Sequence, residues 1–125
     1  TETVLWAAKT DKSKHVFNYQ LMRQHNGGKQ MKTVWKIGTP KKSEKQFGKH
    51  PTQKPLELID RILLASSNEG DLVFDPFMGS CSTGLSALQN NRKFVGCEMN
   101  KEYVDLSVAR LSQERMPFEP MIKTA

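Results

Sequence analysis

The stretch from Asp71 to Thr83 limits the possible folds of this chain more than any other feature. An apolar run, Leu72 to Phe74, ends in an acid, a proline and a turn of small residues, and a helix-like pattern follows at once. A second apolar run over 94–97 ends in Glu98. This order of strand, small-residue turn, helix, strand and acid is typical of parallel α/β domains that bind a nucleoside-bearing ligand. The turn receives the polar end of such a ligand, and the acid accepts hydrogen bonds from ribose hydroxyls.

The second half of the chain alternates helices and strands throughout. Apolar residues recur at helical spacing after Pro55, which suits the first turn of a helix. Such alternation predicts a right-handed parallel βαβ unit. The fold class is therefore α/β, as part of a doubly wound, mostly parallel, Rossmann-like sheet. The expected elements are a helix from Pro55, a strand over 71–75, a helix over 82–90, a strand over 93–98, and a helix after Asn100 with an apolar stripe of Val104, Val108 and Leu111.

The first half shows strand patterns but no complete βαβ unit. Residues 3–8 are apolar enough for a strand buried on both faces, and 16–22 predict a short strand that passes into a helix. Residues 32–37 alternate charged and apolar side chains, as a half-buried strand does. We therefore expect a strand region with a basic loop (1–49), a ligand-binding βαβ region (50–115) and a tail (116–125), all within one larger domain.

Positive charge is concentrated in one part of the chain. The net charge is +6, and the segment 29–49 holds seven lysines opposed only by Glu44. A basic segment beside a ligand-binding turn indicates a polyanionic partner. A lysine-rich, solvated loop is the alternative interpretation.

Other sequence features exclude several classes of protein. No apolar run approaches the roughly 18 residues of a membrane span, so no membrane partner is expected. Cys81 and Cys97 are not spaced as metal ligands, and free thiols indicate the cytoplasm. The chain starts at Thr1 rather than Met, which predicts a start internal to a longer protein.

Two motifs carry a resemblance to a known family. His50-Pro51-Thr52-Gln53-Lys54-Pro55, followed by Asp75-Pro76-Phe77-Met78-Gly79-Ser80 and by Glu98, closely resembles the S-adenosylmethionine-dependent amino-methyltransferases of DNA. Within them it resembles the permuted β group, in which the cofactor half follows the catalytic half. Residues 2–7 and 17–19 are similar to that group's target-pocket segment. The resemblance covers nearly the whole chain and implies methyl transfer to an exocyclic amine of a DNA base, adenine N6 rather than cytosine N4.

The resemblance also implies roles for individual residues. Glu98 would take the ribose hydroxyls, Met99 would pack on the adenine ring, and the turn would contact the methionine part. The implied cofactor site comprises His50, Thr52, Asp75, Phe77, Met78, Gly79, Ser80, Ser82, Glu98 and Met99. The implied contacts with double-stranded DNA, mostly to phosphates, are Arg23, Lys29, Lys32, Lys41, Lys42 and Lys45. Trp6, Phe17 and Tyr19 line the base pocket or, equally, belong to the core.

The chain departs from the family pattern at two points. Cys81 stands where the family has glycine, which costs on the order of 1 kcal/mol if that position needs positive φ. The Asp/Asn/Ser-Pro-Pro-aromatic motif that holds the target amine is absent, so no catalytic residue is expected in this chain. We therefore expect a missing N-terminal half of the same enzyme; the resemblance also allows a homodimer.

Two alternative functions remain open. The first is a non-catalytic cofactor- or DNA-binding half that needs an upstream segment or a partner chain carrying the catalytic motif. The second is a fragment of a nicotinamide or flavin enzyme. That alternative predicts Gly-x-Gly-x-x-Gly in the turn, which this chain lacks.

Overall fold

The computed structural model describes residues 1–114, and the side chains of residues 1–112. The tail predicted over 116–125 lies outside the described residues. The elements are helix α1 (Tyr19–His25), the short 3₁₀ helix η1 (Lys42–Lys45), helix α2 (Leu56–Ser66), strand β1 (Leu72–Asp75), helix α3 (Ser82–Gln89), strand β2 (Lys93–Gly96) and helix α4 (Lys101–Glu114).

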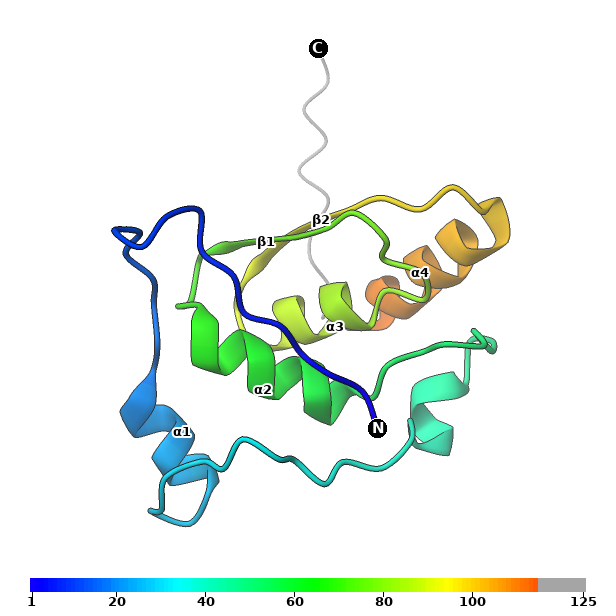
Figure 1. Cartoon of the computed structure of the whole chain (residues 1–125). Coiled ribbons are helices and arrows are strands. Elements are labelled where there is room, and N and C mark those ends of the chain that lie inside the picture. The colour runs from blue at the N-terminus through cyan, green and yellow to red at the C-terminus, as the bar shows by residue number, and fades with distance from the viewer. Residues whose placement is uncertain (115–125) are drawn as a thin grey trace.

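β1 and β2 form a parallel pair in which Leu72 lies opposite Lys93 and Asp75 opposite Gly96. Helix α3 connects the two strands and packs against both of them. Helices α2 and α4 each pack on α3, and α1 packs on α2 (Figure 1). This parallel βαβ unit confirms the predicted α/β class and the order of elements from residue 55 onward.

Polar side chains define the ends of the helices. Asn100 caps α4, because its Oδ1 accepts the backbone N–H of Glu102 at 2.9 Å. Glu44 in η1 accepts the N–H of Leu56 at 2.9 Å, so a side chain from the basic loop caps the start of α2. Both carboxylate and amide oxygens here satisfy helix donors that have no partner within their own helix.

A polar network joins α2 to α3 and to the turn that follows α3. Asp60 Oδ1 accepts hydrogen bonds from Ser86 Oγ at 2.5 Å and from Asn90 Nδ2 at 3.0 Å. The buried Arg92 donates to Ser67 through Oγ at 3.1 Å and through the carbonyl at 2.7 Å. These contacts fix α2 relative to the α3–β2 turn.

The sheet is covered on one face only. Phe94 lies under α3, where it approaches Gly84. Leu72, Phe74 and Val95 are exposed, and strand alternation puts them on the other face. None of the helices of the described residues is drawn on that face (Figure 1).

Three predicted strands are wrong. Residues 1–18 and 30–41 contain no strand; the chain there is irregular, and Val4, Leu5, Trp6 and Val34 are exposed. A strand needs a hydrogen-bonded neighbour, and β1 pairs only with β2 among the described residues. Local pattern alone therefore overestimated the strand content of the first 49 residues.

The predicted apolar stripe of α4 is wrong at Val108, which is exposed, while Val104 and Leu111 are half-buried. Ser107 and Arg110 on the same helix are buried. The reason is that α4 packs on α3 and also contacts the carbonyls of the turn after β1. Among residues 1–114, no helix is long and apolar enough to cross a bilayer.

Candidate functional site

The turn that follows β1 lies where both strands end. Its conformation is left-handed at two positions, with φ of +51° at Gly79 and +59° at Cys81. The N–H of Phe77 donates to Asp75 Oδ1 at 3.0 Å, and the N–H of Met78 donates to the carbonyl of Cys97 at 3.0 Å. The turn is thus held by the ends of β1 and β2 together.

Glu98 faces this turn. Its Oε2 accepts the N–H of Gly79 at 3.1 Å, and its Oε1 accepts the N–H of Asn100 at 2.8 Å. The hydrogen bond from Asn100, followed by that from Gly79, holds the pKa of Glu98 below its usual value. Each carboxylate oxygen keeps a second lone pair, which can accept a hydroxyl from a ligand.

His50 lies against the same turn from the other side. A Cβ placed on Gly79 would lie only 3.1 Å from His50 Nε2, so glycine is needed there both for space and for its positive φ. His50 also accepts at Nδ1 from the N–H of Thr52 at 3.3 Å. Its ring packs on Tyr103 with 4.2 Å between centroids.

Helix α4 closes the back of the turn with two side chains that the sequence analysis missed. Ser107 Oγ donates to the carbonyl of Gly79 at 2.9 Å, and Arg110 Nη1 donates to the carbonyl of Ser80. Burial lowers the pKa of Arg110. A stripe of two polar residues within a helix gives no signal for such a role, because arginine is mostly exposed in proteins.

Cys81 is the buried residue that immediately precedes α3. Its side chain packs where a Cβ on Gly84 would collide with it. Burial raises the pKa of the Cys81 thiol to about 11, so the group is a neutral thiol near pH 7. It therefore has no thiolate with which to act as a nucleophile.

The predicted cofactor residues fall into four groups. His50, Thr52, Gly79 and Glu98 lie together around the turn. Phe77 and Met99 are 88% and 100% exposed, so their side chains are available to a ligand at this edge of the sheet. Ser80 and Ser82 are buried instead, and Ser82 Oγ lies 3.4 Å from Arg110 Nη1. Ser82 thus directs its hydroxyl toward α4. Met78 is half-buried, and Asp75 accepts the N–H of Phe77 in the turn.

The predicted DNA-contact residues do not form a single cluster. Lys41, Lys42 and Lys45 lie in or next to η1, close in sequence to Gly48, where an added Cβ would collide with Leu106 of α4. Lys29 and Lys32 lie in the segment that runs from α1 along α2 toward η1 (Figure 1). Arg23 is already engaged, since Nε and Nη2 donate to the carbonyl of Gly28 at 3.0 and 2.8 Å.

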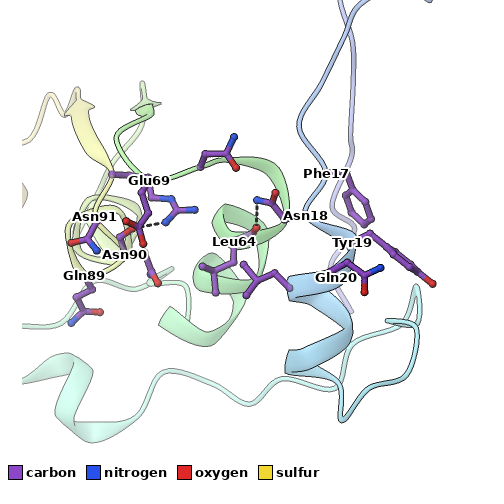
Figure 2. A pocket seen from close by; sticks show the side chains of 12 residues that line it. Phe17, Asn18, Tyr19, Gln20, Leu64, Glu69, Gln89, Asn90 and Asn91 are labelled. Atoms are coloured by element: carbon purple, nitrogen blue, oxygen red, sulfur yellow. Dashed lines mark hydrogen bonds between the residues drawn. The ribbon is translucent and has the colours of Figure 1, made fainter.

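A cavity of about 700 Å³ lies between the start of α1 and the ends of α2 and α3 (Figure 2). Phe17 and Tyr19 line it, and Asn18 donates to the carbonyl of Leu64 at 2.9 Å and so caps the end of α2. Trp6 packs on Phe17, with 5.7 Å between ring centroids. None of the ten predicted cofactor residues lines this cavity. Its lining includes Asn68 and Asn91, which precede β1 and β2 and therefore lie at the opposite end of the strands from the turn.

The sequence predicts no metal site, because Cys81 and Cys97 are not spaced as metal ligands. Over the part of the chain that the structure describes, no group of three or more His, Cys, Asp or Glu side chains could hold a metal ion.

Comparison with known proteins identifies the family. The DNA methylase family matches residues 1–109. The chain is 53% identical to the Type II methyltransferase M2.LlaDCHI of Lactococcus lactis subsp. cremoris over 90% of this chain and 42% of that protein. It is 52% identical to the Type II methyltransferase M2.DpnII of Streptococcus pneumoniae over 91% of this chain and 43% of that protein.

A solved structure is similar as well. The structure of the M1.HpyAVI–SAM complex superimposes with a TM-score of 0.62 at 38% identity, over 80% of this chain and 45% of that one. The chain thus spans less than half the length of the relatives it matches. Its sequence motifs, its parallel βαβ unit and the family match agree, and the chain belongs to the DNA methylase family.

Proposed function

We propose that this chain forms the S-adenosylmethionine-binding half of a DNA amino-methyltransferase. The complete enzyme would methylate an exocyclic amine of a DNA base, adenine N6 rather than cytosine N4. The observation that carries the proposal is the meeting of His50, Gly79 and Glu98 at the carboxyl ends of β1 and β2. These ends are where parallel α/β sheets bind their ligands. The two similar proteins are named Type II methyltransferases, which supports methyl transfer as the activity.

The residues at the turn fit the chemistry of this cofactor. The carboxylate of Glu98 has free lone pairs for two ribose hydroxyls, and the exposed side chain of Met99 can pack on the adenine ring. Ser80 is only 3% exposed, and its backbone amide has no acceptor among residues 1–112, so a carboxylate that reaches the turn would satisfy a buried donor. Phe77, Met78 and His50 would enclose the methionine part.

The cofactor would supply an electrophilic methyl group on a sulfonium. The contribution of this chain to transfer is therefore positioning, since holding reactants in line provides much of the rate enhancement in such reactions. The target base must leave the duplex stack to reach the methyl group. Lys41, Lys42 and Lys45 would hold the DNA backbone during that step without specifying sequence.

Substitution of Glu98 tests the cofactor assignment. We expect the Glu98→Gln variant to bind S-adenosylmethionine about tenfold more weakly than wild type in isothermal titration calorimetry, because an amide replaces one acceptor of the ribose hydroxyls. Glu69→Gln is the matched control, since Glu69 lines the cavity away from the turn. Equal affinity of wild type and Glu98→Gln, or tighter binding of NAD than of S-adenosylhomocysteine, would contradict the assignment.

One observation favours a second function. The chain holds no Asp/Asn/Ser-Pro-Pro-aromatic motif and spans 42% of M2.LlaDCHI. In this second function, the chain would be a non-catalytic half that binds the cofactor and DNA, and a partner segment would carry the catalytic motif. Mixing this chain with the unmatched segment of M2.LlaDCHI, and measuring methyl transfer to duplex DNA, separates the two functions. Transfer by the mixture supports the first, in which this chain supplies the bound cofactor for catalysis, and binding of S-adenosylmethionine and DNA by the mixture without transfer supports the second. A cytoplasmic location stays part of this proposal.

A further inference from the structure

Helix α4 buries a polar stripe and exposes an apolar residue. Tyr103, Ser107 and Arg110 are spaced by four and three residues, so they lie on one face of the helix. Ser107 is 1% and Arg110 is 3% exposed, whereas Val108 is 58% exposed. A guanidinium is among the most costly groups to bury, and one nitrogen of Arg110, Nη2, has no acceptor among the described residues. Packing alone does not account for this choice of residues.

The residues of this stripe contact the turn after β1 and His50, which are both parts of the candidate site. Ser107 holds the carbonyl of Gly79, and Arg110 holds the carbonyl of Ser80. Tyr103 packs on His50, whose ring in turn lies over Gly79. One helix face therefore holds both the turn after β1 and the histidine that covers it.

Holding a carbonyl also orients the amide of the same peptide group. The peptide unit is planar and trans, so the N–H of Ser80 points away from the carbonyl of Gly79. With that carbonyl turned toward Ser107 on α4, the N–H of Ser80 faces away from the helix. This is the amide that has no acceptor among the described residues.

We propose that Ser107 and Arg110 are positioning residues for the cofactor: from α4 they hold the turn in which Gly79 and Cys81 are left-handed, and they present the Ser80 amide to an anionic group of the ligand. This inference rests on the proposed function for the identity of the ligand. Neither residue touches the ligand. The turn conformation itself is a property of the free protein.

The test compares two serines of one helix. Ser107→Ala removes the hydroxyl that holds the turn, and Ser112→Ala removes an exposed hydroxyl whose partner, among residues 1–112, is the carbonyl of Val108 within α4 at 2.7 Å. We expect Ser107→Ala to weaken binding of S-adenosylmethionine about tenfold, because it leaves a buried carbonyl without its donor. We expect Ser112→Ala to bind as wild type does.

Amide hydrogen exchange of the ligand-free protein separates positioning from general destabilisation. We expect Ser107→Ala to speed exchange across 77–82 about tenfold while leaving the amides of α2 and α4 unchanged. Arg110→Lys keeps the charge but only one compact donor group, and we expect an intermediate effect on the same amides. Equal acceleration in α2, α4 and the turn would mean a purely structural role and would overturn the proposal.

The two proposals fail in different ways. If wild type does not bind S-adenosylmethionine, the proposed function falls and the ligand part of this inference falls with it. The positioning of the turn is still decided by exchange in the free protein. If wild type binds and Ser107→Ala binds equally well, with unchanged exchange at 77–82, the inference is overturned while the proposed function stands.

Discussion

Cys81 is the residue at which the family pattern and the backbone conflict. Its φ of +59° is a conformation that glycine adopts freely and that costs other residues roughly 1–2 kcal/mol. The position therefore does require positive φ, and the cysteine is strained. Its buried side chain fills the space beside Gly84, which partly offsets that strain.

We expect Cys81→Gly to bind S-adenosylmethionine more tightly, by about fivefold, because relief of the strain populates the binding form of the turn more fully. Cys81→Ala is the control: it keeps the strained φ and removes the same thiol. The measurement is a calorimetric titration of the three proteins. Equal or weaker binding by Cys81→Gly would refute the prediction.

The residues of the site differ in how far the sequence reveals them. Gly79 and Glu98 could be predicted, because a turn glycine and a strand-end acid follow apolar runs at a fixed spacing. Ser107 and Arg110 could not, since their role depends on which carbonyls α4 meets in three dimensions. For the same reason, the sequence could not predict that the Ser82 hydroxyl points toward Arg110 of α4.

At the scale of elements, polar contacts as well as apolar ones hold the helices together. The α2–α3 junction is held by Asp60 and Arg92, both half-buried or buried and both hydrogen-bonded. Loss of a buried donor costs more than its net contribution, because the acceptors remain without partners.

We expect Arg92→Lys to lower the free energy of unfolding by about 2 kcal/mol, since a lysine cannot donate at once to Ser67 and to the carbonyl of Asn90. Arg23→Lys, whose hydrogen bonds to Gly28 are exposed, should change it by less than about 0.5 kcal/mol. Urea unfolding followed by circular dichroism measures both. A loss at Arg92 no larger than at Arg23 would contradict the prediction.

The elements after residue 55 could be predicted because each carries its own pattern and its partners lie nearby in sequence. The helical repeat after Pro55 and the apolar run at 72–74 are local signals. Residues 3–8 and 32–37 carry strand patterns too, yet they form no strands here. Strand formation depends on a neighbour, which a local pattern does not specify.

At the scale of the whole molecule, the charge of the chain bears on the proposed binding of DNA. Lys41, Lys42 and Lys45 are grouped at η1, and Glu44 among them is used to cap α2 rather than to neutralise them. The division into a basic region (1–49) and a cofactor region (50–115) stays a prediction.

We expect the triple Lys41→Gln, Lys42→Gln, Lys45→Gln variant to bind duplex DNA with a weaker salt dependence, the log–log slope falling by about 0.9 for each lysine that contacts a phosphate. The triple Lys9→Gln, Lys12→Gln, Lys14→Gln variant changes charge equally in an exposed segment and should keep the wild-type slope. Fluorescence anisotropy over a range of salt concentrations measures both. Equal slopes for the two triple variants would argue against contact at η1.

The uncovered face of the β1–β2 pair affects the purification of this polypeptide. Leu72, Phe74 and Val95 expose neighbouring apolar side chains to water, and exposed apolar patches promote aggregation. Precipitation should therefore set in first at high protein concentration and in sulfate buffers, which strengthen such adhesion. Dilute stocks in low-sulfate buffer are the conditions under which its affinities are best measured.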